Sequence, residues 1–222
     1  MKIPSARRTV DAGCALAAIV ALAPALAAIA AAIVLVDGRP VLFRQLRLGR
    51  DFRPFRICKF RTMRQPAAGE SRPAVTGAGD AWITPLGGWL RRWKLDELPQ
   101  LWNILCGEMS LFGPRPELPA YVACYERQFR LLLTVRPGML DPASLRFAHE
   151  ASLLPSGPER ETAYRDGILP RKIALSSAYL ARRSWRSDLG LIPAAIAAIG
   201  RPPRWPPHSG SQHAAPPARA AR

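Results

Sequence analysis

A long uncharged segment near the start of the chain limits the folds open to it. Residues 12–36 contain no charged side chain and are rich in alanine. A helix that spans a bilayer needs roughly 20 apolar residues, so the length suffices. Three interpretations remain open: a cleaved signal peptide, a straight transmembrane helix, and a re-entrant helix that enters the membrane and returns on the same side.

The flanks of this segment favour the re-entrant interpretation. The apolar run continues past Pro24 to Val36, which is longer than the apolar part of a signal peptide. Pro24 near the middle removes a backbone hydrogen bond and kinks a helix. Basic residues mark the cytoplasmic side of a membrane segment, and arginines flank both ends here. They are Arg7, Arg8, Arg39, Arg44, Arg47 and Arg50. We therefore expect both ends of residues 12–36 to face the same compartment.

The charge of the chain indicates anionic partners. The 222 residues carry a formal net charge of +16. Nucleic acid, phosphorylated substrates and anionic lipid are the partner classes that such a charge favours. The four cysteines, Cys14, Cys58, Cys106 and Cys124, have no metal-ligand spacing, which favours free thiols in a reducing compartment.

Two adjacent carboxylates carry the chemistry that the sequence suggests. Asp96 and Glu97 precede Pro99 and an apolar pattern of helical spacing, and Gly107 ends that pattern. We therefore predict Asp96 as a helix N-cap whose ionised form the helix dipole favours. Such a helix end suits a phosphate. The alternative is an ordinary surface pair between Arg92 and Asp96, four residues apart.

The remaining patterns predict a mainly helical α+β fold. Residues 41–45 and 55–60 indicate a strand pair, and residues 64–80 indicate a mobile loop. Thr84 followed by Pro85 predicts a helix start, with Trp89 and Trp93 either in the core or at a membrane interface. Further helices are expected at 119–133, 164–183 with a break near Pro170, and 185–199 at the interface, with a turn at 136–138. Residues 201–222 are predicted to be disordered.

Arg115 lies between two prolines that restrict its backbone. A guanidinium group of fixed direction suits bidentate recognition of a phosphate. The alternative is a buried structural arginine paired with Glu117 or Glu108.

Several motifs together resemble the bacterial sugar transferase family, the monotopic phosphoglycosyl transferases. Residues 95–103 read LDELPQLWN, and residues 109–116 read MSLFGPRP. The likeness extends to FRQ at 43–45, KFRTM at 59–63 and RPG at 136–138, and covers roughly residues 7–199. The chain departs from the family at Trp82, where an arginine is usual, and at Lys94.

This resemblance implies a reaction and a set of residues. The family transfers a sugar 1-phosphate from a UDP-sugar to undecaprenyl phosphate and releases UMP. Asp96 would be the nucleophile that forms a covalent phosphosugar intermediate, Glu97 would hold Mg²⁺, and Pro24 would mark the kink of a re-entrant membrane helix. The expected substrate-binding residues are Lys59, Arg61, Arg91, Arg92, Arg115, Arg136 and Arg146.

The predicted organisation follows from the same resemblance. A re-entrant helix at 1–38 precedes a compact catalytic domain at 39–200, which contains a small β-hairpin and interfacial helices, and a tail at 201–222. The domain is expected on the cytoplasmic face of the bacterial inner membrane.

Two other functions compete with this interpretation. A basic nucleic-acid-binding module would explain the charge, but the sequence has no zinc-finger spacing and no aromatic RNA-binding signature, so no nucleic-acid partner is predicted. A nucleotide-sugar glycosyltransferase would release UDP instead of UMP.

Overall fold

The computed structural model describes residues 6–66, 70, 74–77, 80–155 and 157–199 of the chain. Its described part is mainly helical with two small sheets, which confirms the predicted α+β class. The helices are α1 (Ala6–Asp37), α2 (Pro85–Arg92), α3 (Gln100–Cys106), α4 (Pro119–Cys124), α5 (Glu126–Leu132), α6 (Pro142–Arg146), α7 (Glu159–Thr162), α8 (Leu169–Ala181) and α9 (Trp185–Ile199). The strands are β1 (Leu42–Leu48), β2 (Pro54–Phe60), β3 (Ser110–Phe112) and β4 (Gly138–Leu140).

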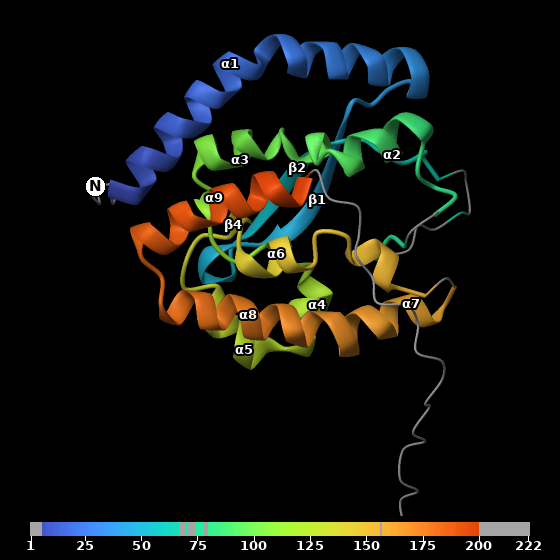
Figure 1. Cartoon of the computed structure of the whole chain (residues 1–222). Helices are drawn as coiled ribbons and strands as arrows, with labels where there is room; N and C mark the ends of the chain where they lie inside the picture. The colour runs from blue at the N-terminus through green and yellow to red at the C-terminus, as the bar shows by residue number, and fades with distance from the viewer. Residues whose placement is uncertain (1–5, 67–69, 71–73, 78–79, 156, 200–222) are drawn as a thin grey trace, which may run out of the picture.

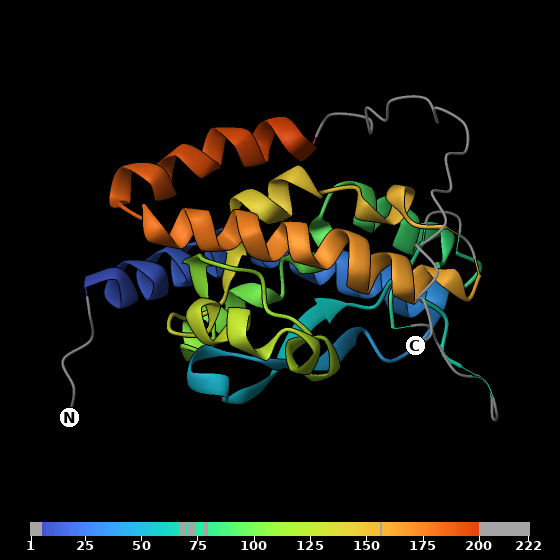
Figure 2. The same ribbon diagram turned by 90° about the horizontal axis from the view of Figure 1, so that it is seen from below.

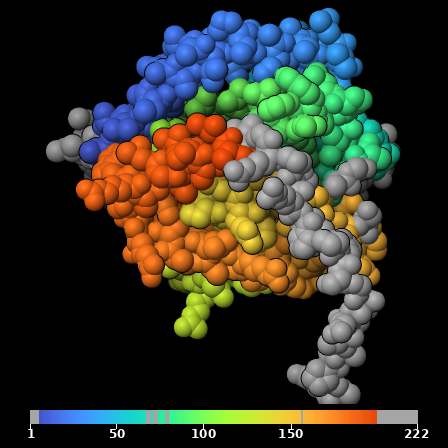
Figure 3. Space-filling model, in the orientation of Figure 1, coloured from blue at the N-terminus to red at the C-terminus, as the bar shows by residue number. Residues whose placement is uncertain are grey.

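Helix α1 forms one edge of the molecule. Figure 1 shows it arching over α3 and α2, and the space-filling view shows its residues as the upper border above those of α2 and α3 (Figure 3). Pro24 lies inside this continuous helix. In the described part of the chain, α1 alone has the length and apolar composition that a membrane crossing requires, and most of that stretch is not buried.

The first turns of α1 are fixed to the rest of the protein. The guanidinium group of Arg8 donates hydrogen bonds of 2.6 Å to the carbonyl oxygens of Ile104 and Leu105, at the end of α3. The buried carboxylate of Asp11 accepts hydrogen bonds from the Ser110 hydroxyl and the Leu111 amide of β3.

The last turn of α1 is fixed as well. The side chain of Arg61 donates to the carbonyl oxygens of Asp37, Gly38 and Arg39, where the carbonyls of a helix end lack partners. The hydroxyl of Thr84 donates to the Asp37 carboxylate over 2.9 Å. Both ends of α1 therefore contact the same folded body, while its middle turns are largely exposed.

The predicted strand pair is confirmed. Strands β1 and β2 pair antiparallel, with Phe43 opposite Lys59. Phe55 and Ile57 of β2 are buried against α1 and α3, in a cluster that includes Ala15 and Ile104. A second apolar cluster joins α4, α5 and α8, and α8 runs across the face opposite α1 (Figure 2).

Helix α2 begins as the sequence indicates. Pro85 occupies its first turn, and the Thr84 hydroxyl accepts a hydrogen bond from the Gly87 amide at 2.9 Å. Trp89 and Trp93 are 51% and 42% exposed, so the alternative that places them in the core is wrong. Helix α9 covers the predicted 185–199.

Three predicted segments differ from the structure. The expected helix at 119–133 is interrupted at Tyr125, whose backbone leaves the helical region. The expected turn at 136–138 leads directly into β4, which pairs parallel with β3. Pro170 lies in the first turn of α8 and does not break the helix; a π-helical stretch, Ala163–Ile168, precedes it.

Two predictions concern segments that the structure describes in part or not at all. The disordered tail at 201–222 lies outside the described residues, and the mobile loop at 64–80 lies partly outside them.

Candidate active site

The acid pair lies in a short 3₁₀ turn, Leu95–Glu97, one turn ahead of α3. Lys94 precedes it in the left-handed region with φ of 56°, which turns the chain between α2 and the acids. Asp96 is therefore not the N-cap of α3, and this prediction is wrong; Pro99 occupies that position instead. Gly107 ends α3 with φ of 85°, as predicted.

The buried side chain of Asn103 joins α3 to β2. Its carbonyl oxygen accepts a hydrogen bond from the Cys58 amide, and its amide group donates to the Arg56 carbonyl, both over 2.9 Å. The same amide group donates to the Glu108 carboxylate at 2.6 Å. These bonds satisfy both polar ends of a buried amide and set the position of Lys59, the next residue of β2, relative to the acids.

Glu97 is the centre of the site. The guanidinium group of Arg115 binds it in a bidentate fashion, with Nη1 at 2.9 Å from Oε2 and Nη2 bonded to Oε1. Lys59 Nζ donates to Oε1 over 3.2 Å, and Gln100 Nε2 donates to Oε2 over 3.0 Å. Three side chains from β2, α3 and the segment after β3 therefore meet at one carboxylate.

The two adjacent acids have opposite electrostatic environments. Burial alone would raise the pKa of Glu97, but the charges of Arg115 and Lys59 outweigh it and hold that pKa well below the usual value. Burial raises the pKa of Asp96, and the charge of Glu97 adds to this, against the opposing charges of Lys59 and Arg91. The expectation that the helix field favours the ionised form of Asp96 is thus wrong.

Asp96 also differs from Glu97 in its contacts. Its side chain is 7% exposed, and its Oδ1 atom is buried without a hydrogen-bond partner among the described residues. A buried oxygen without a partner is uncommon and needs an explanation. Because Asp96 is buried, the alternative of an ordinary surface pair with Arg92 does not hold.

Four cations surround the acids. Lys59, Arg91 and Lys94 act on the charge of Asp96, and Arg115 pairs with Glu97. Burial lowers the pKa of Lys59 against the raising effect of Glu97. Arg91 donates to the Thr62 hydroxyl at 2.8 Å, and Lys94 donates to the Ala148 carbonyl at 2.8 Å. These bonds give each cation a defined direction.

The structure brings only part of the predicted set together. Lys59, Arg91 and Arg115 lie with Asp96 and Glu97. The alternative interpretation paired Arg115 with Glu117 or Glu108. In the structure its partner is Glu97 instead.

The other predicted residues have different surroundings. Arg61 is buried at the end of α1, where its bonds go to backbone carbonyls. Arg136 donates to the Gly107 carbonyl at the opposite end of α3 from the acids. Arg92 and Arg146 have exposed side chains. A phosphate-binding role for these four stays a prediction.

Sequence reasoning missed Lys94 and Gln100 as members of the site. Gln100 is fully buried and lies three residues after Glu97, within the same motif. That spacing on a helical stretch was the available signal for a contact with Glu97.

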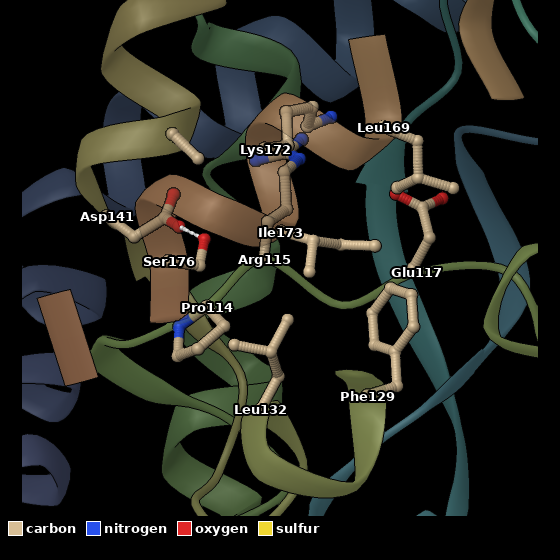
Figure 4. A pocket seen from close by; sticks show the side chains of 11 residues that line it. Pro114, Arg115, Glu117, Phe129, Leu132, Asp141, Leu169, Lys172, Ile173 and Ser176 are labelled. Carbon is tan, nitrogen blue, oxygen red and sulfur yellow. Dashed lines mark hydrogen bonds between the residues drawn. The ribbon is translucent and has the colours of Figure 1, made fainter. Parts of the chain in front are cut away.

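A small cavity of about 20 Å³ lies beside Arg115. Pro114, Phe129 and Leu132 form part of its apolar wall, and Figure 4 shows the Ser176 hydroxyl bonded to Asp141 at its edge. Its volume is that of about one water molecule, too small for a nucleotide.

A second buried ion network includes Glu117 and Lys172, which line this cavity. The carboxylate of Glu117, two residues after Arg115, accepts bonds of 2.8 Å from Arg47 and from the Tyr164 hydroxyl. Lys172 donates to the same hydroxyl and to Glu150. This network fixes the backbone next to Arg115.

Comparison with known proteins agrees with this arrangement. The family model described as bacterial sugar transferase matches residues 3–201. The chain belongs to the bacterial sugar transferase family. The match includes α1, the acid pair and α9, so the family covers all the elements that build the site.

Individual members of the family resemble shorter parts of the chain. The undecaprenyl-phosphate glucose phosphotransferase of Komagataeibacter xylinus is 43% identical over 113 residues, which are 51% of this chain and 21% of that protein. The UDP-glucose:undecaprenyl-phosphate glucose-1-phosphate transferase of Escherichia coli K12 is 41% identical, over 53% of this chain and 26% of that protein. The exopolysaccharide production protein PSS of Rhizobium leguminosarum bv. phaseoli is 38% identical, over 63% of this chain and 73% of that protein. The chain thus spans about a quarter of the first two relatives and most of the third.

The environment of Asp96 predicts that its charge opposes folding. An acid whose folded-state pKa is raised binds more protons in the folded state, so its contribution to stability falls as pH rises through that pKa. Asp96→Asn should therefore raise the melting temperature of the detergent-solubilised, metal-free protein at pH 7.5. A gain of about 1 kcal/mol would correspond to roughly 2–4 °C for a chain of this size.

The matched control is Asp51→Asn, which removes the same charge from an exposed side chain. It should leave the melting temperature nearly unchanged. A lower melting temperature for Asp96→Asn than for the wild type would contradict the assigned environment.

Proposed function

We propose that this protein transfers a sugar 1-phosphate from a UDP-sugar to undecaprenyl phosphate and releases UMP. The observation that carries the proposal is the buried, unpartnered Oδ1 of Asp96 beside four cations. The names of the relatives support it, because two of them are phosphotransferases of glucose that use undecaprenyl phosphate.

The charges of the site suit a diphosphate. The charges of Lys59, Arg91, Lys94 and Arg115 act on the two carboxylates, so the acids lie in a mainly cationic environment. A nucleotide-sugar diphosphate carries two negative charges, which such an environment would attract. Arginine and lysine differ in function here: the N–H donors of Arg115 that are not bonded to Glu97 orient phosphate oxygens, and Lys59 supplies a compact charge.

The first half-reaction is a displacement at the phosphorus that bears the sugar. Oδ1 of Asp96 attacks this phosphorus and forms an O–P bond, while the bond to the bridging oxygen breaks and its electron pair leaves with UMP. The surrounding cations stabilise the charge that develops on the phosphoryl oxygens. Lys59 and Arg91 favour the ionised form of Asp96 against burial, and attack by that form needs no general base.

The second half-reaction restores the enzyme. An oxygen of undecaprenyl phosphate attacks the same phosphorus, and the Asp96 carboxylate leaves. The product is an undecaprenyl diphosphate sugar. Both attacking groups are oxyanions, which explains why one cluster of cations can serve both halves.

The predicted magnesium ion stays a prediction. In the described part of the chain, no group of three or more His, Cys, Asp and Glu side chains could hold a metal. Both oxygens of Glu97 are occupied by the donors described above. The residues therefore do not fit a metal held by Glu97, and no step of the mechanism passes through one.

The acceptor requires a location at the membrane, because the phosphate of a polyprenyl lipid stays near the headgroups. Members of this family are associated with membranes, and α1 is apolar enough to enter one. Trp102 of α3 and Trp89 of α2 are more than half exposed, and both helices lie beside α1 (Figure 1), which suits an interfacial position. We propose the cytoplasmic face of the bacterial inner membrane as the site of action.

We further propose that α1 is re-entrant. Both of its ends bind the same folded body, through Arg8 and Asp11 at one end and Asp37 at the other. A helix that crosses the bilayer fully would place one end on the far side, away from that body.

The topology can be tested with single cysteines. In a variant without the four natural cysteines, Ala6→Cys and Leu42→Cys should both react with an impermeant maleimide applied from the cytoplasmic side of inverted membrane vesicles. Labelling of the two positions from opposite sides would rule out the re-entrant arrangement.

The covalent intermediate is the test of the mechanism. Purified protein given UDP-glucose without lipid acceptor should release about one UMP per active site and gain the mass of a hexose phosphate on the peptide that contains Asp96. UDP-N-acetylgalactosamine is a second donor to try, because a relative uses it. Asp96→Asn should give neither product, whereas Asp51→Asn should behave as the wild type.

Two results would contradict this mechanism. Release of UMP only when undecaprenyl phosphate is present would indicate direct displacement between the substrates. Release of UDP in place of UMP would show transfer of the sugar without its phosphate.

A further inference from the structure

The carboxylate of Glu97 is saturated with hydrogen bonds. A carboxylate offers about four lone-pair positions. Oε1 accepts from Lys59 Nζ and Arg115 Nη2, and Oε2 accepts from Arg115 Nη1 and Gln100 Nε2. Each oxygen thus accepts two donors, and none of the lone pairs is left for a further ligand.

We propose that Glu97 is a positioning residue that holds Arg115 and Lys59 ready for the donor diphosphate, and that it is not the protein's ligand for a divalent cation. The part of this inference that concerns the diphosphate rests on the proposed function. The part that concerns the metal follows from the occupied oxygens alone.

Electrostatics favour this assignment over metal binding. A divalent cation at either oxygen would have to displace a donor and would then lie next to the charges of Arg115 and Lys59. Gln100 directs an amide N–H, which a metal cannot use, at the same carboxylate. Like charges at such short distances in a buried site are strongly unfavourable.

The donors keep the capacity to bind phosphate while Glu97 holds them. A guanidinium group has five N–H donors, of which Arg115 uses two on Glu97, and an ammonium group has three, of which Lys59 uses one. The two prolines restrict the backbone of Arg115 and the carboxylate fixes its other end. The guanidinium plane is therefore set before the substrate arrives, which lowers the cost of ordering it on binding.

The first test measures stability without metal. In EDTA, Glu97→Gln should lower the melting temperature, because two largely buried cations lose their anion. Adding Arg115→Gln to this variant should restore part of the loss, because one unpaired cation is then removed. Glu126→Gln, which removes a charge from an exposed pair, is the matched control and should change little.

A metal ligand would give the opposite sign. Removing one of two adjacent carboxylates from an empty metal site relieves their repulsion, so an unchanged or higher melting temperature for Glu97→Gln would overturn the proposal. If Glu97→Gln does not fold, the double variant decides: a failure of Arg115→Gln to restore folding would also overturn it.

The second test separates positioning from a purely structural role. For Glu97→Gln, turnover per folded molecule should fall by roughly 100-fold, as for other misplaced site groups. Two metal readouts should stay within a factor of about two of the wild type. One is the Mg²⁺ concentration at half-maximal rate. The other is the affinity for Mn²⁺ with UDP bound, measured by electron paramagnetic resonance. Unchanged turnover, or a loss of Mn²⁺ affinity of about tenfold or more, would overturn the proposal.

These readouts remain informative if the proposed reaction is wrong. Failure of the reaction would appear as absent sugar phosphate transfer by the wild type. The melting temperatures and the Mn²⁺ affinity do not depend on that activity, so they still decide the role of Glu97.

Discussion

The bidentate pair between Glu97 and Arg115 is the interaction on which the candidate site depends. It connects the 3₁₀ turn before α3 with the segment after β3, and Lys59 of β2 joins it. The pair is largely buried, and removing one partner leaves an uncompensated charge, which is destabilising. The same pair separates the two acids chemically, because Glu97 takes the strongest donors and leaves Asp96 buried with an unpartnered oxygen. A carboxyl with a raised pKa beside one with a depressed pKa is the pattern expected where adjacent acids have different functions.

Helix α1 and helix α3 depend on each other for their positions. Arg8 of α1 binds the carbonyls at the end of α3, while Asn103 of α3 binds β2. The apolar helix is therefore part of the framework that positions the acids and not an independent anchor. In the proposed membrane location, this coupling would keep the site at a constant depth relative to the lipid headgroups, where the acceptor phosphate lies.

The sequence predicted the elements that depend on local signals. The Thr84 cap, the Gly107 end of α3 and the β1–β2 pair all follow from side chains within a few residues of the feature they determine.

Prediction from the sequence failed where the deciding partner is distant in the chain. The alternative weighed for Arg115 was a structural pair with Glu117 or Glu108, but its partner in the structure is Glu97, 18 residues away. The ionisation of Asp96 was judged from the helix dipole, whereas burial by distant segments decides it. Of the cations that the family resemblance indicated, Lys59, Arg91 and Arg115 lie with the two acids. Arg61 and Arg136 instead bind backbone carbonyls elsewhere in the structure.

Asp96 and Glu97 are adjacent in the chain but have opposite electrostatic environments. Carbon-13 NMR of protein labelled at the aspartate and glutamate carboxyl carbons tests this difference most directly, with Asp96→Asn and Glu97→Gln used to assign the two signals. As the pH is lowered in the metal-free protein, Asp96 should take up its proton above the usual range of an aspartate, and Glu97 well below the usual range of a glutamate. Titration of both groups at ordinary values, or in the reverse order, would contradict the account.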